Sequence, residues 1–118
     1  MNQDKIREMV KTAYQALDDK KGEDIRIINV ADISVLADYF IIANGTNESQ
    51  VAALVDNVKE ELYKIGCEPR QIEGIRNKSW ILMDYNDVII HVFSKDDRVF
   101  YDLERIWKDG KVVEVTDL

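Results

Sequence analysis

One stretch constrains the fold more than any other: Trp80 to Phe93 is apolar except at a single break. The break is Asp84-Tyr85-Asn86-Asp87, whose residues favour turns. The stretch therefore predicts two antiparallel strands joined by a hairpin connection. A loop at Tyr85-Asn86 predicts a register in which residue 80 lies opposite 91, 82 opposite 89, and 83 opposite 88.

The two faces of this predicted hairpin differ in character, because side chains alternate along a strand. One face carries aliphatic side chains and a methionine, and the other carries large aromatics and the only histidine of the chain. The first set is Ile81, Met83, Val88, Ile90 and Val92, and the second is Trp80, Leu82, Ile89, His91 and Phe93. A sheet that is apolar on both faces is either covered twice or leaves one face for a partner.

Length and charge narrow the class of protein. The 118 residues predict a single domain, residues 1–118, with one core. A net charge of −7 without a basic run argues against wrapping nucleic acid and favours a basic protein partner. No stretch approaches the ~18 apolar residues of a membrane span. Asp4 and Glu8 do not fit a signal or transit peptide, so we expect a cytoplasmic protein.

Hydrophobic spacing in the first half predicts a helix at about residues 3–19 ended by Gly22, a short strand at Ile25–Ile28, and a connection from Val30 to Ala37. Residues 38–44 are apolar almost throughout, which predicts a central strand. Asn47 or Thr46 would then cap a helix, with Gln50 as the capping-box partner of Asn47. That helix shows an unbroken apolar stripe of Val51, Leu54, Val55, Val58, Leu62 and Ile65.

The second half predicts a short strand at Gln71–Glu73, the hairpin, and a last helix. Asp96 or Asp97 would cap that helix, Phe100, Leu103 and Trp107 would line one side, and Gly110 would end it. Residues 112–115 would form a short extended tail, and 116–118 would fray. The fold class is α/β in the order α-β-β-α-β-β-β-α, a mixed sheet with helices packed on it.

Three places carry potential chemistry, each with a structural alternative. Cys67 is either an incidental loop thiol or one half of a catalytic pair with His91. Gly45-Thr46, between a strand and a helix, resembles turns that hold phosphate, but it lacks the glycines and lysine of a P-loop. Asp84 and Asp87 are either turn residues or metal ligands, and their position beside a turn favours the first.

The aromatic face suggests recognition rather than catalysis. His91 is either a packed histidine or a surface residue beside Trp80, its predicted cross-strand neighbour. Tryptophan, tyrosine and arginine dominate interface energies. Trp80, Arg98, Tyr101 and Trp107 are therefore the candidate contact residues, although each can equally serve the core.

Several segments together resemble the ribosomal silencing factor family, RsfS, also called Iojap or YbeB. They are Asp38-Tyr39-Phe40-Ile41-Ile42, Gly45-Thr46, Glu73-Gly74, the run from Trp80 to Phe93, and Arg98, Tyr101, Leu103-Glu104 and Trp107. The chain departs from the family at Asn86, where Gly is frequent, and at Asn47 and Gln50, where Ser and His are frequent. Asn86 still suits a turn, because Asn tolerates positive φ.

The resemblance implies a nucleotidyltransferase-like fold without the catalytic acids, and therefore no enzyme activity, cofactor or metal. It implies binding to protein fourteen of the large ribosomal subunit, on the face that meets the small subunit. The bound protein would block subunit joining and repress translation under nutrient limitation. We expect little direct RNA contact, no membrane association, and room for a homodimer off the ribosome.

The predicted partner-binding residues are Trp80, His91, Arg98 and Tyr101, with Asp84 and Trp107 in supporting roles. Two alternatives stay open: a metal-dependent enzyme of nucleotidyltransferase type that uses Gly45, Thr46 and Asp84, and a generic protein-interaction module.

Overall fold

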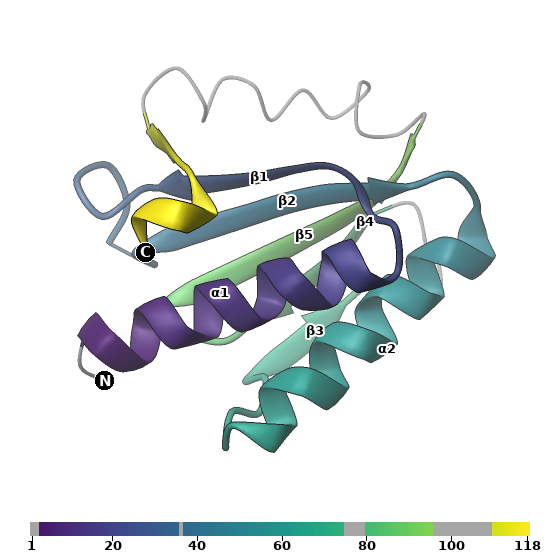
Figure 1. Ribbon diagram of the computed structural model, residues 1–118, viewed down its shortest axis with the longest axis horizontal. Coiled ribbons are helices and arrows are strands. Elements are labelled where there is room, and N and C mark those ends of the chain that lie inside the picture. Colours follow the sequence, from purple (N-terminus) through teal and green to yellow (C-terminus); the bar gives the residue numbers. More distant parts are fainter. Residues whose placement is uncertain (1–2, 36, 75–79, 96–109) are drawn as a thin grey trace.

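The computed structural model describes residues 3–35, 37–74, 80–95 and 110–118 (Figure 1). The elements are α1 (Gln3–Asp19), β1 (Glu23–Asn29), β2 (Tyr39–Gly45), α2 (Glu48–Lys64), β3 (Gln71–Glu73), β4 (Trp80–Asp84), β5 (Val88–Ser94), β6 (Lys111–Val113) and the 3-10 turn η1 (Val115–Asp117). The predicted last helix falls at residues 96–109, outside the described residues.

The described strands form one mixed sheet in the order β3-β4-β5-β2-β1-β6. β2 and β5 pair in parallel, and the other neighbours pair antiparallel. Figure 1 shows α1 and α2 on the same side of this sheet. The predicted mixed α/β class and the central position of residues 38–44 are both confirmed.

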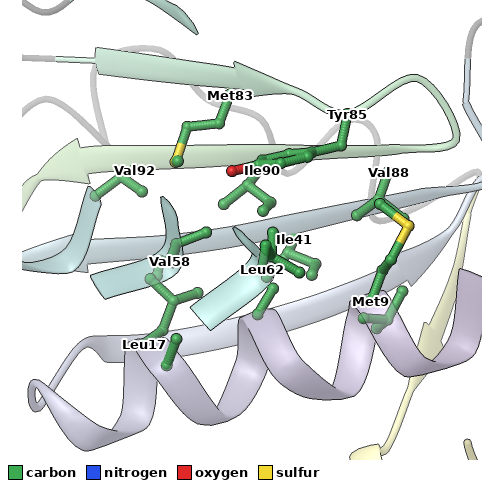
Figure 2. Packing of buried hydrophobic residues seen from close by; sticks show 14 of the residues in the cluster. Met9, Leu17, Ile41, Val58, Leu62, Met83, Tyr85, Val88, Ile90 and Val92 are labelled. Carbon is green, nitrogen blue, oxygen red and sulfur yellow. The ribbon is translucent and has the colours of Figure 1, made fainter. Parts of the chain in front are cut away.

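The core fills the space between the two helices and the sheet. Figure 2 shows Met9 and Leu17 from α1 and Val58 and Leu62 from α2 packing toward Ile41 of β2. From the hairpin, the predicted aliphatic side chains join them; these are Ile81, Met83, Val88, Ile90 and Val92. A second, smaller buried cluster gathers Ile28, Val30, Ile42 and Phe93. Both predicted faces of the hairpin are therefore confirmed.

The predicted register of the hairpin is wrong by two residues. Trp80 pairs with Phe93, Leu82 with His91, and Asp84 with Ile89, so Trp80 and His91 are diagonal neighbours rather than directly opposite. The loop is Asn86-Asp87, closed by a 3.0 Å hydrogen bond from Tyr85 N to Val88 O. Tyr85 is 2% exposed and belongs to the core, which is why it is not a loop residue. A shift of two residues keeps every side chain on its predicted face.

The turn before α2 also differs from the predicted capping box. Asn47 is the N-cap, and its side chain accepts a 2.9 Å hydrogen bond from Gln50 N, as predicted. The Gln50 side chain instead accepts from the backbone N–H of Thr46, at 2.6 Å. Its amide nitrogen donates to Lys21 O, at 2.8 Å, which ties α2 to the turn after α1.

The C-terminal segment does not fray at Thr116 to Leu118. β6 pairs with β1, and η1 follows it. Val115 and Leu118 pack against the core on the helix side, so apolar contact orders this end of the chain.

Candidate partner-binding surface

The face of the sheet opposite α1 and α2 is the candidate surface, and we call it the outer face. Its side chains come from four adjacent strands and are Ile28, Phe40, Ile42, Trp80, Leu82, Ile89, His91 and Phe93. Pairing aligns them in rows across the sheet. One row runs Asp84, Ile89, Phe40, Ile28 and Val112, and the next runs Leu82, His91, Ile42 and Arg26.

Among the described residues, four rings on the outer face form an aromatic cluster, namely Phe40, Trp80, His91 and Phe93. Trp80 stacks on Phe93 with ring centroids 5.3 Å apart, and Phe40 meets His91 edge-on at 5.0 Å. Phe93 is fully buried, whereas Trp80 and Phe40 are only partly buried. Such ring pairs stabilise a structure by more than the burial of apolar area alone. The other three rings of the cluster therefore support the partly exposed indole of Trp80.

His91 is the polar centre of the aromatic cluster. Its Nδ1 accepts a 3.1 Å hydrogen bond from the indole Nε1–H of Trp80. It is only 5% exposed, and burial lowers the pKa of His91 to about 4. The imidazole is therefore neutral at pH 7 with its proton on Nε2, because Nδ1 must be free to accept. Nε2 is buried without a hydrogen-bond partner among the described residues.

Backbone geometry also positions Trp80. Gly74 follows β3 and has a φ of +86°, which side-chain-bearing residues rarely adopt. A Cβ atom there would overlap the carbonyl oxygen of Trp80. The glycine therefore lets the chain pass close to the start of β4, where the partly exposed Trp80 begins the strand.

Asp84 lies at the end of the outer face that is nearest the hairpin turn. One carboxylate oxygen accepts from Asn86 N at 2.8 Å, and the other lies 2.7 Å from Arg70 Nη2. Asn86 has a φ of 71°, the positive value expected of a turn residue. Both carboxylate oxygens thus already bind protein groups. Across the described parts of the chain, no three His, Cys, Asp or Glu side chains gather as a metal site would require.

Of the residues predicted to form the site, the structure brings Trp80 and His91 into direct contact. Asp84 lies on the same face of β4, at the opposite end of the strand from Trp80. Arg98, Tyr101 and Trp107 lie outside the described residues. Sequence reasoning missed Phe40 as a cluster member. Its signal was present in the alternation of β2, but its contact with His91 depends on the parallel pairing of β2 with β5.

Two chemical alternatives meet structural obstacles. Cys67 packs in the helix-side core, whereas His91 lies on the outer face, so the suggested Cys–His pair is wrong. At the Gly45-Thr46 turn, both the N–H and the hydroxyl of Thr46 donate to Gln50 Oε1, at 2.6 and 2.8 Å. These bonds occupy donors that a phosphate would need.

The close packing of that turn explains its glycine. A Cβ atom at Gly45 would lie 3.0 Å from Val51 N and 3.1 Å from Val51 Cγ2. The turn thus serves the contact between β2 and α2.

Neither helix that the structure describes combines the length and apolar character needed to cross a membrane.

Comparisons with known proteins agree on one family. The family model described as ribosomal silencing factor during starvation matches residues 3–118. The ribosomal silencing factor RsfS of Halalkalibacterium halodurans is 39% identical over 109 residues, covering 92% of this chain and 93% of that protein. A crystal structure of a protein from Chromobacterium violaceum is similar with a TM-score of 0.84 and 35% identity, covering 87% of this chain and 86% of that one.

A more distant relative is the mouse protein named mitochondrial assembly of ribosomal large subunit protein 1. It is 28% identical over 91 residues, which cover 75% of this chain and 40% of that protein. The family model spans nearly the whole chain, and the bacterial relative matches over nearly its full length. The chain therefore belongs to the ribosomal silencing factor family, RsfS.

Proposed function

We propose that this chain binds the large ribosomal subunit through its protein fourteen and blocks joining of the small subunit. Translation would then be repressed when nutrients are short. Membership of the silencing factor family supports the regulatory role. The name of the mouse relative, which refers to the large ribosomal subunit, supports the choice of subunit.

The proposed contact surface is the outer face around Trp80. The observation that carries it is a partly exposed tryptophan on an aromatic base, on the side of the sheet away from both described helices. Tryptophan on a packed base is typical of the residues that dominate binding energy. His91, Arg98 and Tyr101 complete the proposed surface, with Asp84 and Trp107 supporting it.

Charge gives the partner its expected chemistry. With a net charge of −7, the chain would associate faster with a basic ribosomal protein and would make little direct contact with RNA. The partly exposed side chains of this face, Trp80 and Phe40, would let two copies pair off the ribosome. This role places the protein in the cytoplasm, where it would act without catalysis, cofactor or metal.

Co-sedimentation with purified large subunits, with and without small subunits, tests the proposal. The wild-type chain should sediment with large subunits and reduce the yield of joined ribosomes. Trp80→Ala should weaken both effects roughly thirtyfold or more, which corresponds to a hot spot of ~2 kcal/mol. Tyr63→Ala is the matched control, because Tyr63 is a 66% exposed aromatic on α2, away from the outer face.

Two results would contradict the proposal. Wild-type chain that stays in the supernatant would remove the ribosome as partner. A folded Trp80→Ala variant that still blocks subunit joining at wild-type concentrations would show that the outer face is the wrong surface.

A further inference from the structure

The histidine of the aromatic cluster is placed unlike a contact residue. His91 is 5% exposed, so a docking partner would touch Trp80 and Phe40 before it touched the imidazole. Its Nδ1 is used by the indole of Trp80, and its Nε2 is buried without a partner among the described residues. A phenylalanine would fill this position without any unpaired polar atom, so packing alone does not explain a histidine here.

The indole ring of Trp80 is held in a single orientation only if its N–H donates to a hydrogen-bond acceptor. Two rings support it, since Trp80 stacks on Phe93 and lies 5.9 Å from His91 between ring centroids. Stacking is tolerant of rotation in the ring plane, whereas a hydrogen bond is directional. The 3.1 Å bond from Nε1 to His91 Nδ1 therefore determines which edge of the indole is turned inward and which is presented outward.

We propose that His91 is a positioning residue that orients the Trp80 side chain for docking and makes no contact with the partner itself. This inference rests on the proposed function, because it assigns the purpose of the bond to binding at the outer face. It gives His91 a role within the proposed surface that differs from that of Trp80. A buried Nε2 that finds no partner in the described part of the chain is then the cost of having an acceptor at Nδ1.

The tautomer can be read without any mutation, because the chain has one histidine. A long-range ¹⁵N–¹H correlation spectrum of the native protein should show the proton on Nε2 and an unprotonated Nδ1. A proton on Nδ1 would exclude the hydrogen bond and overturn the inference. This measurement holds even if a substitution at His91 prevents folding.

The second measurement concerns the indole itself. The chain has two tryptophans, so the spectrum should contain two indole N–H signals, and Trp80→Phe identifies the one from Trp80. His91→Phe should move the Trp80 signal upfield. Ile42→Val is the matched control, since Ile42 pairs with His91 on the neighbouring strand but takes no part in the bond. An unmoved Trp80 signal in His91→Phe would overturn the inference.

The third measurement is a double-mutant cycle with purified large ribosomal subunits. His91→Phe should weaken binding about five- to tenfold, the equivalent of one hydrogen bond, while the thermal stability of the chain is kept or raised. In a Trp80→Phe background, where no indole N–H exists, His91→Phe should have no further effect. Equal losses in both backgrounds would mean that His91 contacts the partner, and would overturn the inference.

Different results would overturn the proposed surface and the role of His91. If Trp80→Ala binds large subunits as the wild type does, the proposed surface is wrong and the purpose assigned to His91 is wrong with it. If Trp80→Ala weakens binding while His91→Phe binds as the wild type does, the proposed function stands and only the inference about His91 is overturned.

Discussion

Arg70 and Asp84 are joined twice, once by a 2.7 Å ion pair between side chains and once by a 2.7 Å hydrogen bond from Arg70 N to Asp84 O. The two residues lie at the hairpin end of the sheet, where β3 approaches β4. Asp84 is nearly buried and also holds the turn through Asn86 N, whereas the Arg70 side chain is 64% exposed. The Asp84 carboxylate should therefore contribute more to the stability of the fold than the Arg70 guanidinium does.

Asp84→Ala should cost about 1.5–3 kcal/mol of unfolding free energy, because it removes a charge-assisted bond inside the turn. Arg70→Ala should cost less, about 1 kcal/mol or below, since exposed ion pairs contribute little. Asp84 also lines a cavity of about 150 Å³ beside Arg70, which gives water room to replace the guanidinium. Urea unfolding of both variants measures the difference. A larger loss for Arg70→Ala would show that the ion pair, rather than the turn, is the important contact.

Tyr85→Phe should leave stability unchanged or raise it by up to about 1 kcal/mol. Figure 2 shows the Tyr85 ring turned inward beside Ile90, and its hydroxyl has no hydrogen-bond partner among the described residues. Burial raises the pKa of Tyr85 to about 12. Removing an unpaired buried hydroxyl removes a desolvation cost. Thermal unfolding checks this, with Tyr63→Phe, on the exposed side of α2, as the control. Clear destabilisation by Tyr85→Phe would mean that the hydroxyl has a partner.

Alternation and helical spacing predicted most of the fold, because both are local properties of the chain. The stripe on α2 and the two faces of the hairpin depend only on periods of 3.6 and 2. The register depends on which residues the turn contains, and the loop predicted at Tyr85-Asn86 includes Tyr85, which is buried. Composition alone does not show whether an aromatic beside a turn points inward.

The candidate site was predictable only where its members share the hairpin. Trp80 and His91 lie on one face under either register, so their proximity survived the two-residue error. The contact of Phe40 with His91 joins strands that are distant in sequence, and the Arg70–Asp84 pair joins the residue before β3 to the last residue of β4. Those contacts depend on strand order, which local patterns do not determine.

The buried imidazole should make stability depend on pH between about 6.5 and 4. In the unfolded chain His91 has its ordinary pKa near 6.5, whereas burial lowers the pKa of native His91 to about 4. The unfolded state therefore binds the proton more readily, and this contribution to stability is present above pH 6.5 and lost as the pH falls. Between pH 7.5 and pH 5 it amounts to about 2 kcal/mol.

Urea unfolding of the wild type and His91→Phe at both pH values isolates this histidine from the carboxylates, which titrate in both proteins. NMR titration of the single imidazole gives the native pKa directly. A native pKa near 6.5 would show that His91 is exposed to solvent.

Leu54→Ala should cost about 2–5 kcal/mol, the usual range for emptying a packed leucine site. Leu54 is fully buried in the middle of α2 and approaches the turn at Gly22, where one of its methyl carbons would lie 3.1 Å from a Cβ atom. Lys59→Ala, on the exposed side of the same helix, should change stability by less than ~0.5 kcal/mol. A loss below about 1 kcal/mol for Leu54→Ala would contradict the packing of α2 on the sheet.

Association with large ribosomal subunits should slow as salt is raised, while dissociation should change little. An acidic chain meeting a basic protein is steered by long-range attraction, which salt screens. Glu73 pairs with Leu82 at the border of the outer face, whereas Glu60 lies on α2, on the other side of the sheet. Glu73→Lys and Glu60→Lys change the net charge equally, but only Glu73→Lys places the new charge beside the proposed surface.

Stopped-flow association rates of these two variants therefore test where the attraction acts. Glu73→Lys should lower the association rate more than Glu60→Lys, and the difference should shrink at high salt. Trp80→Ala should instead raise the dissociation rate, because short-range packing is lost and the long-range field is unchanged. Equal slowing by both lysine variants would mean that net charge alone steers the encounter. Association rates that do not depend on salt would leave the aromatic cluster as the only basis for recognition.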